Sequence, residues 1–441
     1  MASFIRSSKF KHVYCDPPKV DAQYTQFRLS TTTGEQNYIK ANPKYFAVAL
    51  AGGGGPVAVV PLDKPGRCND VPHISGHTAA VLDFEFNPFN DQLLATCSED
   101  TTIKLWEIPE GGLKEPVTTP LVDMHGHARK VTLLRFHPTA ENVLASISGD
   151  FSVKLWDVGR ASEIASADGI HEQLIEDIVW DYTGKHYATA CKDKNVRIMD
   201  ARTSAVADTI TAAHEGAKSM KLVYAGKQDF LISVGFTKQS QRQFKIWDPR
   251  NTSKEVEKVD IDQAAGVMMP FFDVDTNMLY LAGKGDGNVR YYEICSSKPH
   301  AFPLNDFRTS QSAKGMCMVP KRGLNIMGCE ITRMLKLTTN SVAPLSFFVP
   351  RKSDSFQDDI YPDTAACTAA QTSDEWLGGA DKSPVLMSLN PSQAAEAARH
   401  SVRKTFVASK SAVQLQEELD VANERIKVLE ERLTAAGLST D

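Results

Sequence analysis

The chain has 441 residues, a formal net charge of −5 at pH 7, and a composition that is 42% hydrophobic and 23% charged. Such a chain can bury a sizeable core, which excludes a mostly disordered protein. The acidic balance excludes a general nucleic-acid binder. No uninterrupted apolar stretch reaches the ~18 residues of a membrane span, and the N-terminus lacks the apolar segment of a signal peptide. We therefore expect a cytoplasmic protein with no membrane span.

The first 44 residues are more basic than the rest of the chain. They carry seven Lys or Arg side chains against three Asp or Glu. This local excess of positive charge suits docking on an acidic protein surface. A solvated basic face would have the same composition, so the charge alone does not decide between the two.

Two segments of the chain, Gly76–Glu107 and Gly126–Asp157, align along their whole length. Each reads Gly-His, an alternating apolar run, a turn with Pro, a second run, Ser-x-Asp, and a third run that ends in Trp and an acid. In both, the His and the Asp are 23 residues apart, and the Trp follows the Asp by six. These marks are the signature of WD repeats, each of which supplies four short strands.

Weaker copies of the repeat extend over most of the chain. They predict third strands that end near residues 62, 107, 157, 200, 248, 293 and 338. One such blade cannot bury both of its faces, whereas seven blades in a ring can. We predict an all-β fold, a seven-bladed WD-repeat β-propeller over residues 1–350. The candidate strands for closing the ring are Phe10–Tyr14 and Leu345–Pro350.

The polar marks of the two clear repeats could be mistaken for a catalytic triad. Because the set recurs, and a catalytic site is normally needed once, we predict hydrogen-bond networks that hold the turns of each blade. The residues of these networks are His77, Ser98, Asp100 and Trp106, and in the next blade His127, Ser148, Asp150 and Trp156.

No other pattern predicts an enzyme, a cofactor or a metal site. Gly52–Gly55 and Gly283–Gly285 lack the spacing of a phosphate-binding loop, and we expect them to form turns between strands. The eight cysteines include no C-x-x-C pair and no zinc-ligand spacing with His. We therefore expect free thiols.

The strand pattern stops after Pro350. We assign residues 351–364 to an extension packed on the propeller, and residues 365–410, rich in Ala, Ser and Thr, to a variable flexible linker. Residues 411–435 have a seven-residue apolar period and predict a coiled coil.

The apolar stripe of the coiled coil must be buried by self-association or against the propeller, and the strict seven-residue pattern favours self-association. Arg425 to Glu430 resembles a pattern that favours trimers, with a dimer or tetramer as alternatives. The residues predicted to form the oligomer contacts are Leu415, Leu419, Ala422, Arg425, Ile426, Leu429, Glu430 and Leu433.

Several longer motifs resemble the coronin family. They are Ser7–Tyr14, Met269–Asp273, Leu279–Asn288, Arg290–Glu293, Val349–Asp354 and Phe356–Thr364. The resemblance covers residues 3–364, and the chain is similar in length to the short, single-propeller members. The Ala-rich linker departs from the family, which puts any partner contact there in doubt.

The resemblance implies a protein that binds actin filaments and regulates their turnover with cofilin and the branching actin-related-protein complex. It implies a filament-binding role for the arginine that matches Arg28, and we add Lys9 and Lys11 because they lie in the N-terminal motif. It also implies a location at the actin cytoskeleton and cell cortex, and a coiled coil that oligomerises the protein and contacts the branching complex. The alternative is a WD-repeat scaffold for a trafficking or signalling complex, with actin secondary.

Overall fold

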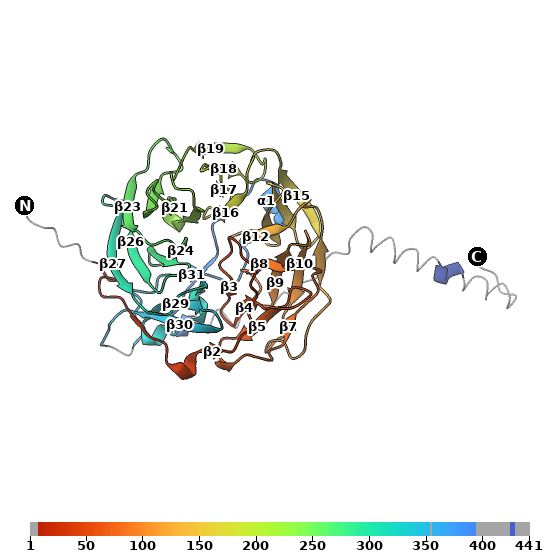
Figure 1. Ribbon diagram of the computed structural model, residues 1–441, viewed down its shortest axis with the longest axis horizontal. Coiled ribbons are helices and arrows are strands. Elements are labelled where there is room, and N and C mark those ends of the chain that lie inside the picture. The colour runs from red at the N-terminus through yellow and green to blue at the C-terminus, as the bar shows by residue number, and fades with distance from the viewer. Residues whose placement is uncertain (1–7, 353–354, 394–423, 428–441) are drawn as a thin grey trace, which may run out of the picture.

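A computed structural model describes residues 8–352, 355–393 and 424–427. Seven twisted sheets stand around a central axis as the blades of a propeller (Figure 1). The predicted all-β, seven-bladed fold is confirmed. Among the described residues, no helix has the length and apolar character needed to cross a membrane.

Blades 1 to 3 are four-stranded antiparallel sheets. Blade 1 contains β3 (Ile39–Ala41), β4 (Tyr45–Ala49), β5 (Val57–Pro61) and β7 (His73–Ile74). Blade 2 contains β8 (Val81–Phe86), β9 (Leu93–Ser98), β10 (Ile103–Glu107) and β11 (Val122–Met124). Blade 3 contains β12 (Val131–Phe136), β13 (Val143–Ser148), β14 (Val153–Asp157) and β15 (Ser162–Ala167).

Blades 4 to 6 have the same plan. Blade 4 contains β16 (Ile175–Trp180), β17 (His186–Cys191), β18 (Val196–Asp200) and β19 (Val206–Ile210). Blade 5 contains β20 (Lys221–Tyr224), β21 (Leu231–Phe236), β22 (Arg242–Trp247) and β23 (Glu257–Asp262). Blade 6 contains β24 (Met268–Asp273), β25 (Met278–Gly283), β26 (Val289–Ile294) and β27 (Ala301–Phe307). Short 3₁₀ turns in the described chain are η1 (Val20–Ala22), η2 (Gly226–Gln228), η3 (Lys321–Gly323) and η4 (Ile326–Gly328).

The burial of each strand follows from its place in the blade. The second strands β9 and β13 are buried at every position because neighbouring blades cover both of their faces. The outermost strands β15 and β19 are largely half-buried or exposed. Trp106 of blade 2 shares one apolar cluster with Tyr45 and Val59 of blade 1, so the core lies between the blades.

Blade 7 closes the ring by joining the two ends of the propeller chain. It contains β28 (Gly315–Val319), β29 (Glu330–Leu337) and β30 (Ser341–Phe348), together with β1 (Tyr14–Asp16), β2 (Tyr24–Thr25) and β6 (Gly66–Arg67). β30 pairs with β1 where Phe348 faces Tyr14, and with β2 where Val342 faces Tyr24. The two ends of β30 therefore hold two different pieces of the N-terminal arm.

Two predicted boundaries in this region were wrong. The N-terminal strand begins at Tyr14, because Phe10 lies in a turn and is buried with Val13 in an apolar cluster of blades 6 and 7. The third strand of blade 7 ends at Phe348 and not near residue 338, because the run that ends at Leu337 is the second strand of its blade.

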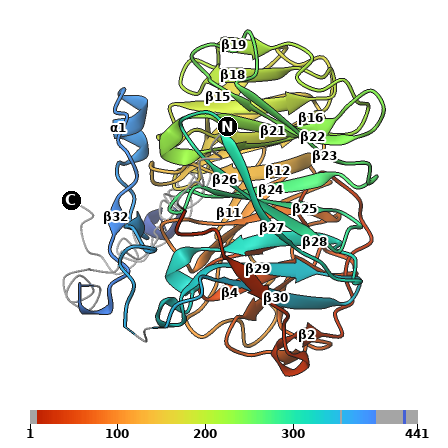
Figure 2. The same ribbon diagram turned by 90° about the vertical axis from the view of Figure 1, so that its left-hand side faces the viewer.

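Residues 364–389, called the strap below, lie along one face of the ring (Figure 2). The strap contains β31 (Thr364–Ala365), α1 (Ser373–Leu377) and β32 (Leu386–Met387). Helix α1 begins in a capping box, in which Thr372 and Glu375 each bind the backbone N–H of the other. The helix is only five residues long, so its stability comes from packing on the propeller and not from helix propensity.

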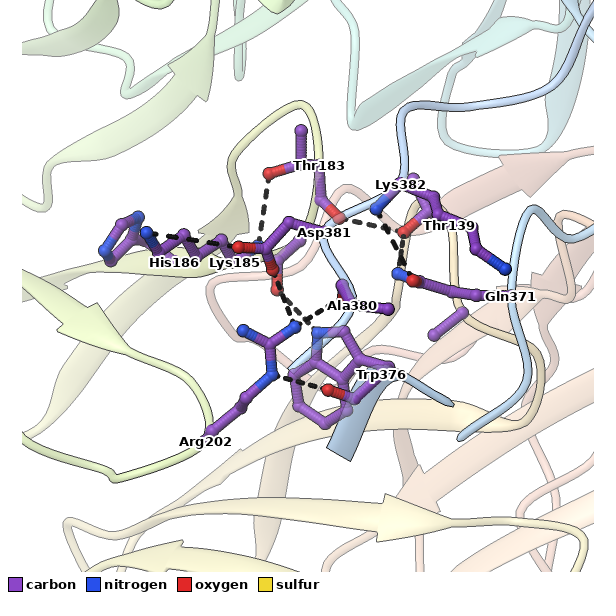
Figure 3. A network of polar contacts seen from close by, with 12 residues as sticks. Thr139, Thr183, Lys185, His186, Arg202, Gln371, Trp376, Ala380, Asp381 and Lys382 are labelled. Carbon is purple, nitrogen blue, oxygen red and sulfur yellow. Dashed lines mark hydrogen bonds and ion pairs between the residues drawn. The ribbon is translucent and has the colours of Figure 1, made fainter. Parts of the chain in front are cut away.

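The prediction of a flexible linker from residue 365 was wrong for the described part of that segment. Trp376 is fully buried, and its ring centroid lies 4.9 Å from that of His137 and 6.4 Å from that of Trp180. The Arg202 guanidinium lies 5.2 Å from the Trp376 centroid and donates to Trp376 O, Ala380 O and the Asp381 carboxylate, each at 2.6 Å (Figure 3). The buried ring of Trp376 and its contacts with Arg202 therefore hold the strap on the propeller, although the average composition of this segment is that of a linker.

The predicted coiled coil falls mostly outside the described residues. Arg425 and Ile426 lie in the helical piece 424–427, where Ile426 is 51% exposed. The other predicted contacts, Leu415, Leu419, Ala422, Leu429, Glu430 and Leu433, are outside the described residues.

Candidate interaction surface

The repeated His and Asp side chains form a buried network in each of blades 2 and 3. In blade 2, His77 Nδ1 lies 2.9 Å from the Asp100 carboxylate, and His77 Nε2 lies 2.8 Å from Thr96 Oγ1. Trp106 Nε1 donates to the same hydroxyl at 2.8 Å. A neutral His77 with its proton on Nδ1 satisfies all three partners, because the Thr96 hydroxyl then donates to Nε2.

Blade 3 repeats this arrangement with Ser146 in place of Thr96. His127 Nδ1 lies 3.0 Å from the Asp150 carboxylate, and His127 Nε2 and Trp156 Nε1 lie 2.7 and 2.8 Å from Ser146 Oγ. A buried network thus joins the His, Asp and Trp in each of these two blades, but its bridging hydroxyl is two residues earlier than the sequence indicated. Ser98 and Ser148 instead accept hydrogen bonds from the backbone N–H groups of Asp100 and Asp150.

The electrostatics of this network are those of a structural element. Burial lowers the pKa of His77 and of His127, so both rings are neutral at pH 7 even though each faces a carboxylate. Burial would raise the pKa of Asp100, but hydrogen bonds from Thr102, with His77 and Thr78, lower it to about 2. Thr96 is fully buried between His77 and Trp106, so no substrate can reach its hydroxyl.

Arg28, the predicted filament-binding residue, is exposed on a rigid piece of backbone. Its carbonyl accepts from Ala51 N at 2.8 Å, and Leu29 forms a β-bridge with Leu50. The preceding residue, Phe27, donates to Asn340 O at 3.0 Å. Within the described chain, the Arg28 guanidinium takes part in no ion pair.

Lys9 and Lys11 are also exposed, but the structure does not place them beside Arg28. β1 and β2 pair with opposite ends of β30, so the segments on either side of them lie near opposite faces of the ring. Lys9 Nζ donates to Asp359 O, in the extension that leads to the strap. The basic residues of the N-terminal arm therefore do not form one surface, because Arg28 lies near one face of the ring and Lys9 and Lys11 near the other.

The face that carries Arg28 also carries the loops with His77 and Asp100, and we call it the His–Asp face; the opposite one is the strap face. Basic residues that sequence reasoning missed occupy equivalent loops of blades 3 to 6. The exposed ones are Arg129, Lys130, Lys192, Lys194, Lys238 and Arg308. The sequence contained a signal for these residues. Aligning the repeats shows on which face each loop lies, and these residues are close to the His and Asp positions of the repeat.

The central channel encloses a cavity of about 450 Å³ whose charged lining is neutralised internally. The ion pairs are Lys40 with Glu85, Lys221 with Glu35, and Arg135 with Asp83, Glu85 and Asp177. Toward the strap the lining is mixed, with the apolar Phe89, Met318 and Val385 and a further ion pair between Arg322 and Asp91. Among the described residues, no group of three or more His, Cys, Asp or Glu side chains could hold a metal ion.

Ring closure, four-stranded blades and two His–Asp–Trp networks define a WD-repeat propeller, a class that presents binding surfaces. The pattern for "WD domain, G-beta repeat" matches residues 68–107 and 118–157, and that for "Type of WD40 repeat" matches residues 342–384. A third pattern, "Domain of unknown function (DUF1899)", matches residues 3–67, the N-terminal arm and most of blade 1.

Relatives place the chain more narrowly. It is 46% identical over 390 residues to Coronin-A of Dictyostelium discoideum, covering 88% of this chain and 87% of that protein. The solved WD40 domain of Toxoplasma gondii coronin superposes with a TM-score of 0.82 at 33% identity, covering 86% of this chain and 98% of that one. A chain of the Mitotic Checkpoint Complex, at 16% identity and a TM-score of 0.59 over 78% of this chain and 95% of that one, shares the fold alone.

The chain therefore belongs to the coronin family. The members and WD-repeat propellers it matches are scaffolds and not enzymes, in agreement with the buried state of the His–Asp networks.

Proposed function

We propose that this coronin binds actin filaments through its His–Asp face and regulates the actin cytoskeleton at the cell cortex. Family membership supports the partner, and the exposed, rigidly held Arg28 supports the face. Strand pairing already fixes the backbone around Arg28, so a contact with an acidic surface costs side-chain entropy alone, which is less than the cost of ordering a mobile loop. Lys9 and Lys11, near the strap face, would reach a second actin subunit or serve another contact.

Single contacts of this kind are weak and fall with salt, because exposed charges are screened. We propose that residues 411–435 form a coiled coil, with a trimer favoured, that joins several propellers. Linked propellers raise the effective concentration for the second contact, and avidity can rise by about 10²–10⁴-fold. Contact with the branching actin-related-protein complex and with cofilin belongs to the same proposal.

The course of the strap suggests how the propellers of such an oligomer would be oriented. The described chain leaves the propeller after Leu389, which is buried in the cluster that also contains Phe10 and Val349, near the strap face. Oligomers joined through the segment beyond it would leave their His–Asp faces free of one another. Each propeller could then reach a separate actin subunit.

Co-sedimentation with actin filaments at near-physiological salt tests the proposal. Saturable pelleting by wild type should fall at least ten-fold in affinity for Arg28→Glu. The matched control is Lys254→Glu, which reverses an exposed charge on the opposite, strap face and should leave pelleting unchanged. Equal affinity of Arg28→Glu and wild type would exclude the His–Asp face, and no pelleting of folded wild type would exclude filament binding.

Removal of residues 408–441 separates single-contact affinity from avidity. The truncated chain should still pellet, but with an apparent affinity at least ten-fold lower and with a stronger loss on adding salt. Analytical ultracentrifugation of the same two proteins checks that the truncation removes oligomers. Unchanged filament affinity after loss of oligomers would rule out the avidity mechanism.

A further inference from the structure

Lys336 differs from the other fully buried lysines of the described chain. Lys104, Lys154 and Lys221 are 7%, 9% and 3% exposed, and each pairs with a carboxylate, of Asp123, Glu163 and Glu35 respectively. Lys336 is 1% exposed and has no carboxylate within ion-pair distance among the described residues. Its ammonium group donates to the backbone carbonyl of Gln311. The most buried of these cations is thus the one without a counter-charge.

This lysine lines a groove between blades 6 and 7. The groove holds about 430 Å³ and is bordered by the end of β27 and the loop that follows it, by the proline pair before η1, and by β30. Arg308 also lines it, with its Nε held by Asp306 at 2.7 Å, while its side chain is 76% exposed. Thr309 and Ser310 add hydroxyl groups to the same wall.

Burial of an unpaired ammonium group is unfavourable, because its hydration is lost and no opposite charge replaces it. Burial lowers the pKa of Lys336 to about 8, and the only carboxylate that acts against this fall is Asp286. Met334 on the same face of β29 and the cross-strand partners Met316 and Ala343 are apolar, so an apolar residue would suit this position equally well. The lysine is therefore costly for stability in the isolated chain.

We propose that the groove between blades 6 and 7 is an oxyanion-binding site, in which Lys336 at the floor and Arg308 at the rim receive a phosphate or carboxylate group. The anion supplies the counter-charge that the fold lacks. The hydroxyls of Thr309 and Ser310 offer hydrogen bonds to its remaining oxygens. The group could be a free ion or could be carried on an acidic polypeptide segment.

Thermal unfolding of the full chain in chloride tests the site against a purely structural role. Lys336→Met should leave the Tm unchanged or raise it, because it removes an uncompensated charge. Lys221→Met is the matched control and should lower the Tm, because it takes the paired ammonium group away from the partly buried Glu35 carboxylate. A fall in Tm for Lys336→Met as large as that for Lys221→Met would overturn the proposal.

Ligand addition at constant ionic strength then identifies the source of the anion. Inorganic phosphate, acetate and a hexaglutamate peptide are compared, and at least one should raise the Tm of wild type and of the surface variant Lys254→Met. Lys336→Met should lose that shift. A shift by phosphate points to a free or phosphorylated ligand, and a shift by the peptide alone points to a protein-borne carboxylate. No shift with any of the three, or an equal shift in Lys336→Met, would refute the site.

A spectroscopic measurement covers the case in which Lys336→Met does not fold. Burial lowers the pKa of both Lys336 and Lys284 to about 8, so wild type made with ¹³C-labelled lysine should show two Cε resonances that titrate near pH 8. The one missing from Lys336→Arg is that of Lys336. The effective anion should raise the pKa of that resonance, because it favours the charged form. A pKa that does not move at saturating anion would contradict the proposal independently of stability.

Discussion

The His–Asp network of blade 2 and the anchor of the strap solve the same packing problem in different ways. Both bury a whole indole ring against a neutral histidine, Trp106 with His77 and Trp376 with His137. The first is encoded in a repeat, so its residues recur at fixed spacings in blade 3. The second occurs once and joins segments about 240 residues apart in sequence. A contact that recurs at fixed spacing can be predicted from the sequence. A contact that occurs once cannot, even when its side chains are buried to the same extent.

Replacing each tryptophan by alanine should separate the two contacts most strongly. Trp106→Ala should lower the free energy of unfolding of the propeller by about 3–5 kcal/mol, because it empties a site between two blades. Trp376→Ala removes a ring of the same size but should release the strap locally, with a much smaller change in the unfolding of the propeller. Urea denaturation measures the first effect, and limited proteolysis within residues 364–389 measures the second.

The control for both variants is Leu377→Ala, which truncates the neighbouring side chain that is 39% exposed. It should change neither the urea midpoint nor the cleavage rate appreciably. If Trp376→Ala destabilised the propeller as much as Trp106→Ala, the strap would be an integral part of the fold and not an attached segment.

Acid should destabilise the protein through histidines that lack a carboxylate partner. Burial lowers the pKa of both His137 and His171 to about 4, against about 6.5 in an unfolded chain. Below pH 6.5 the unfolded chain binds protons at these sites and the folded chain does not, so stability falls as the pH falls toward 4. Between pH 7 and pH 5, each should cost roughly 2 kcal/mol.

His171→Gln tests this account, because glutamine keeps a polar side chain but does not titrate in this range. Urea unfolding at pH 7 and pH 5 should show a smaller loss of stability for the variant than for wild type. His77→Gln is a poor substitute, because Asp100 opposes the effect of burial on the pKa of that ring. Identical pH dependence of His171→Gln and wild type would show that His171 does not contribute to the acid response.

The bridging hydroxyl of blade 2 gives a finer test of the network. Thr96→Val should lower the free energy of unfolding by about 2–3 kcal/mol, because it leaves Trp106 Nε1 and His77 Nε2 buried without a partner. Ser98→Ala should cost about 1 kcal/mol, since it removes one acceptor of a turn hydrogen bond. Chemical denaturation of the two variants side by side measures the difference, and the reverse order would restore Ser98 as the bridge.

The same contrast explains what the sequence could and could not predict. The number of blades follows from repeat spacing and is confirmed, and the same spacing brings His77 to Asp100 and His127 to Asp150. That the ends of the propeller chain pair in one blade was also expected, but the bounds of the N-terminal strand were wrong. The choice between Thr96 and Ser98 could not be made, because both hydroxyls lie in the same strand and only the geometry of the turn assigns the ring nitrogen to one. The end of the third strand of blade 7 was predicted too early for a similar reason. Blade 7 lacks the Trp that marks the end of this strand in blades 2 and 3.

The strap was missed because its composition was averaged over 46 residues. A narrower reading had a signal, since Thr372 to Glu375 is a capping box directly before a tryptophan in a segment otherwise poor in large apolar residues. The partners of that tryptophan could not be inferred. Arg202 and His137 lie in turns of two different blades, and no periodicity links them to residue 376.

The two arginines that hold the strap should contribute unequally, and this is the smallest effect we expect. Arg160 binds Asp374 through two contacts of 2.6 and 2.7 Å, but both side chains are about half exposed or more, so solvent screens the pair and Arg160→Ala should weaken strap docking only marginally. Arg202 covers the indole and donates to two backbone carbonyls as well as to Asp381, so Arg202→Ala leaves buried acceptors unpaired and should cost about 1–3 kcal/mol. Strap cleavage rates at low and high salt distinguish them. Cleavage of wild type should rise only slightly with salt, because the contact that salt screens best is the one that contributes least.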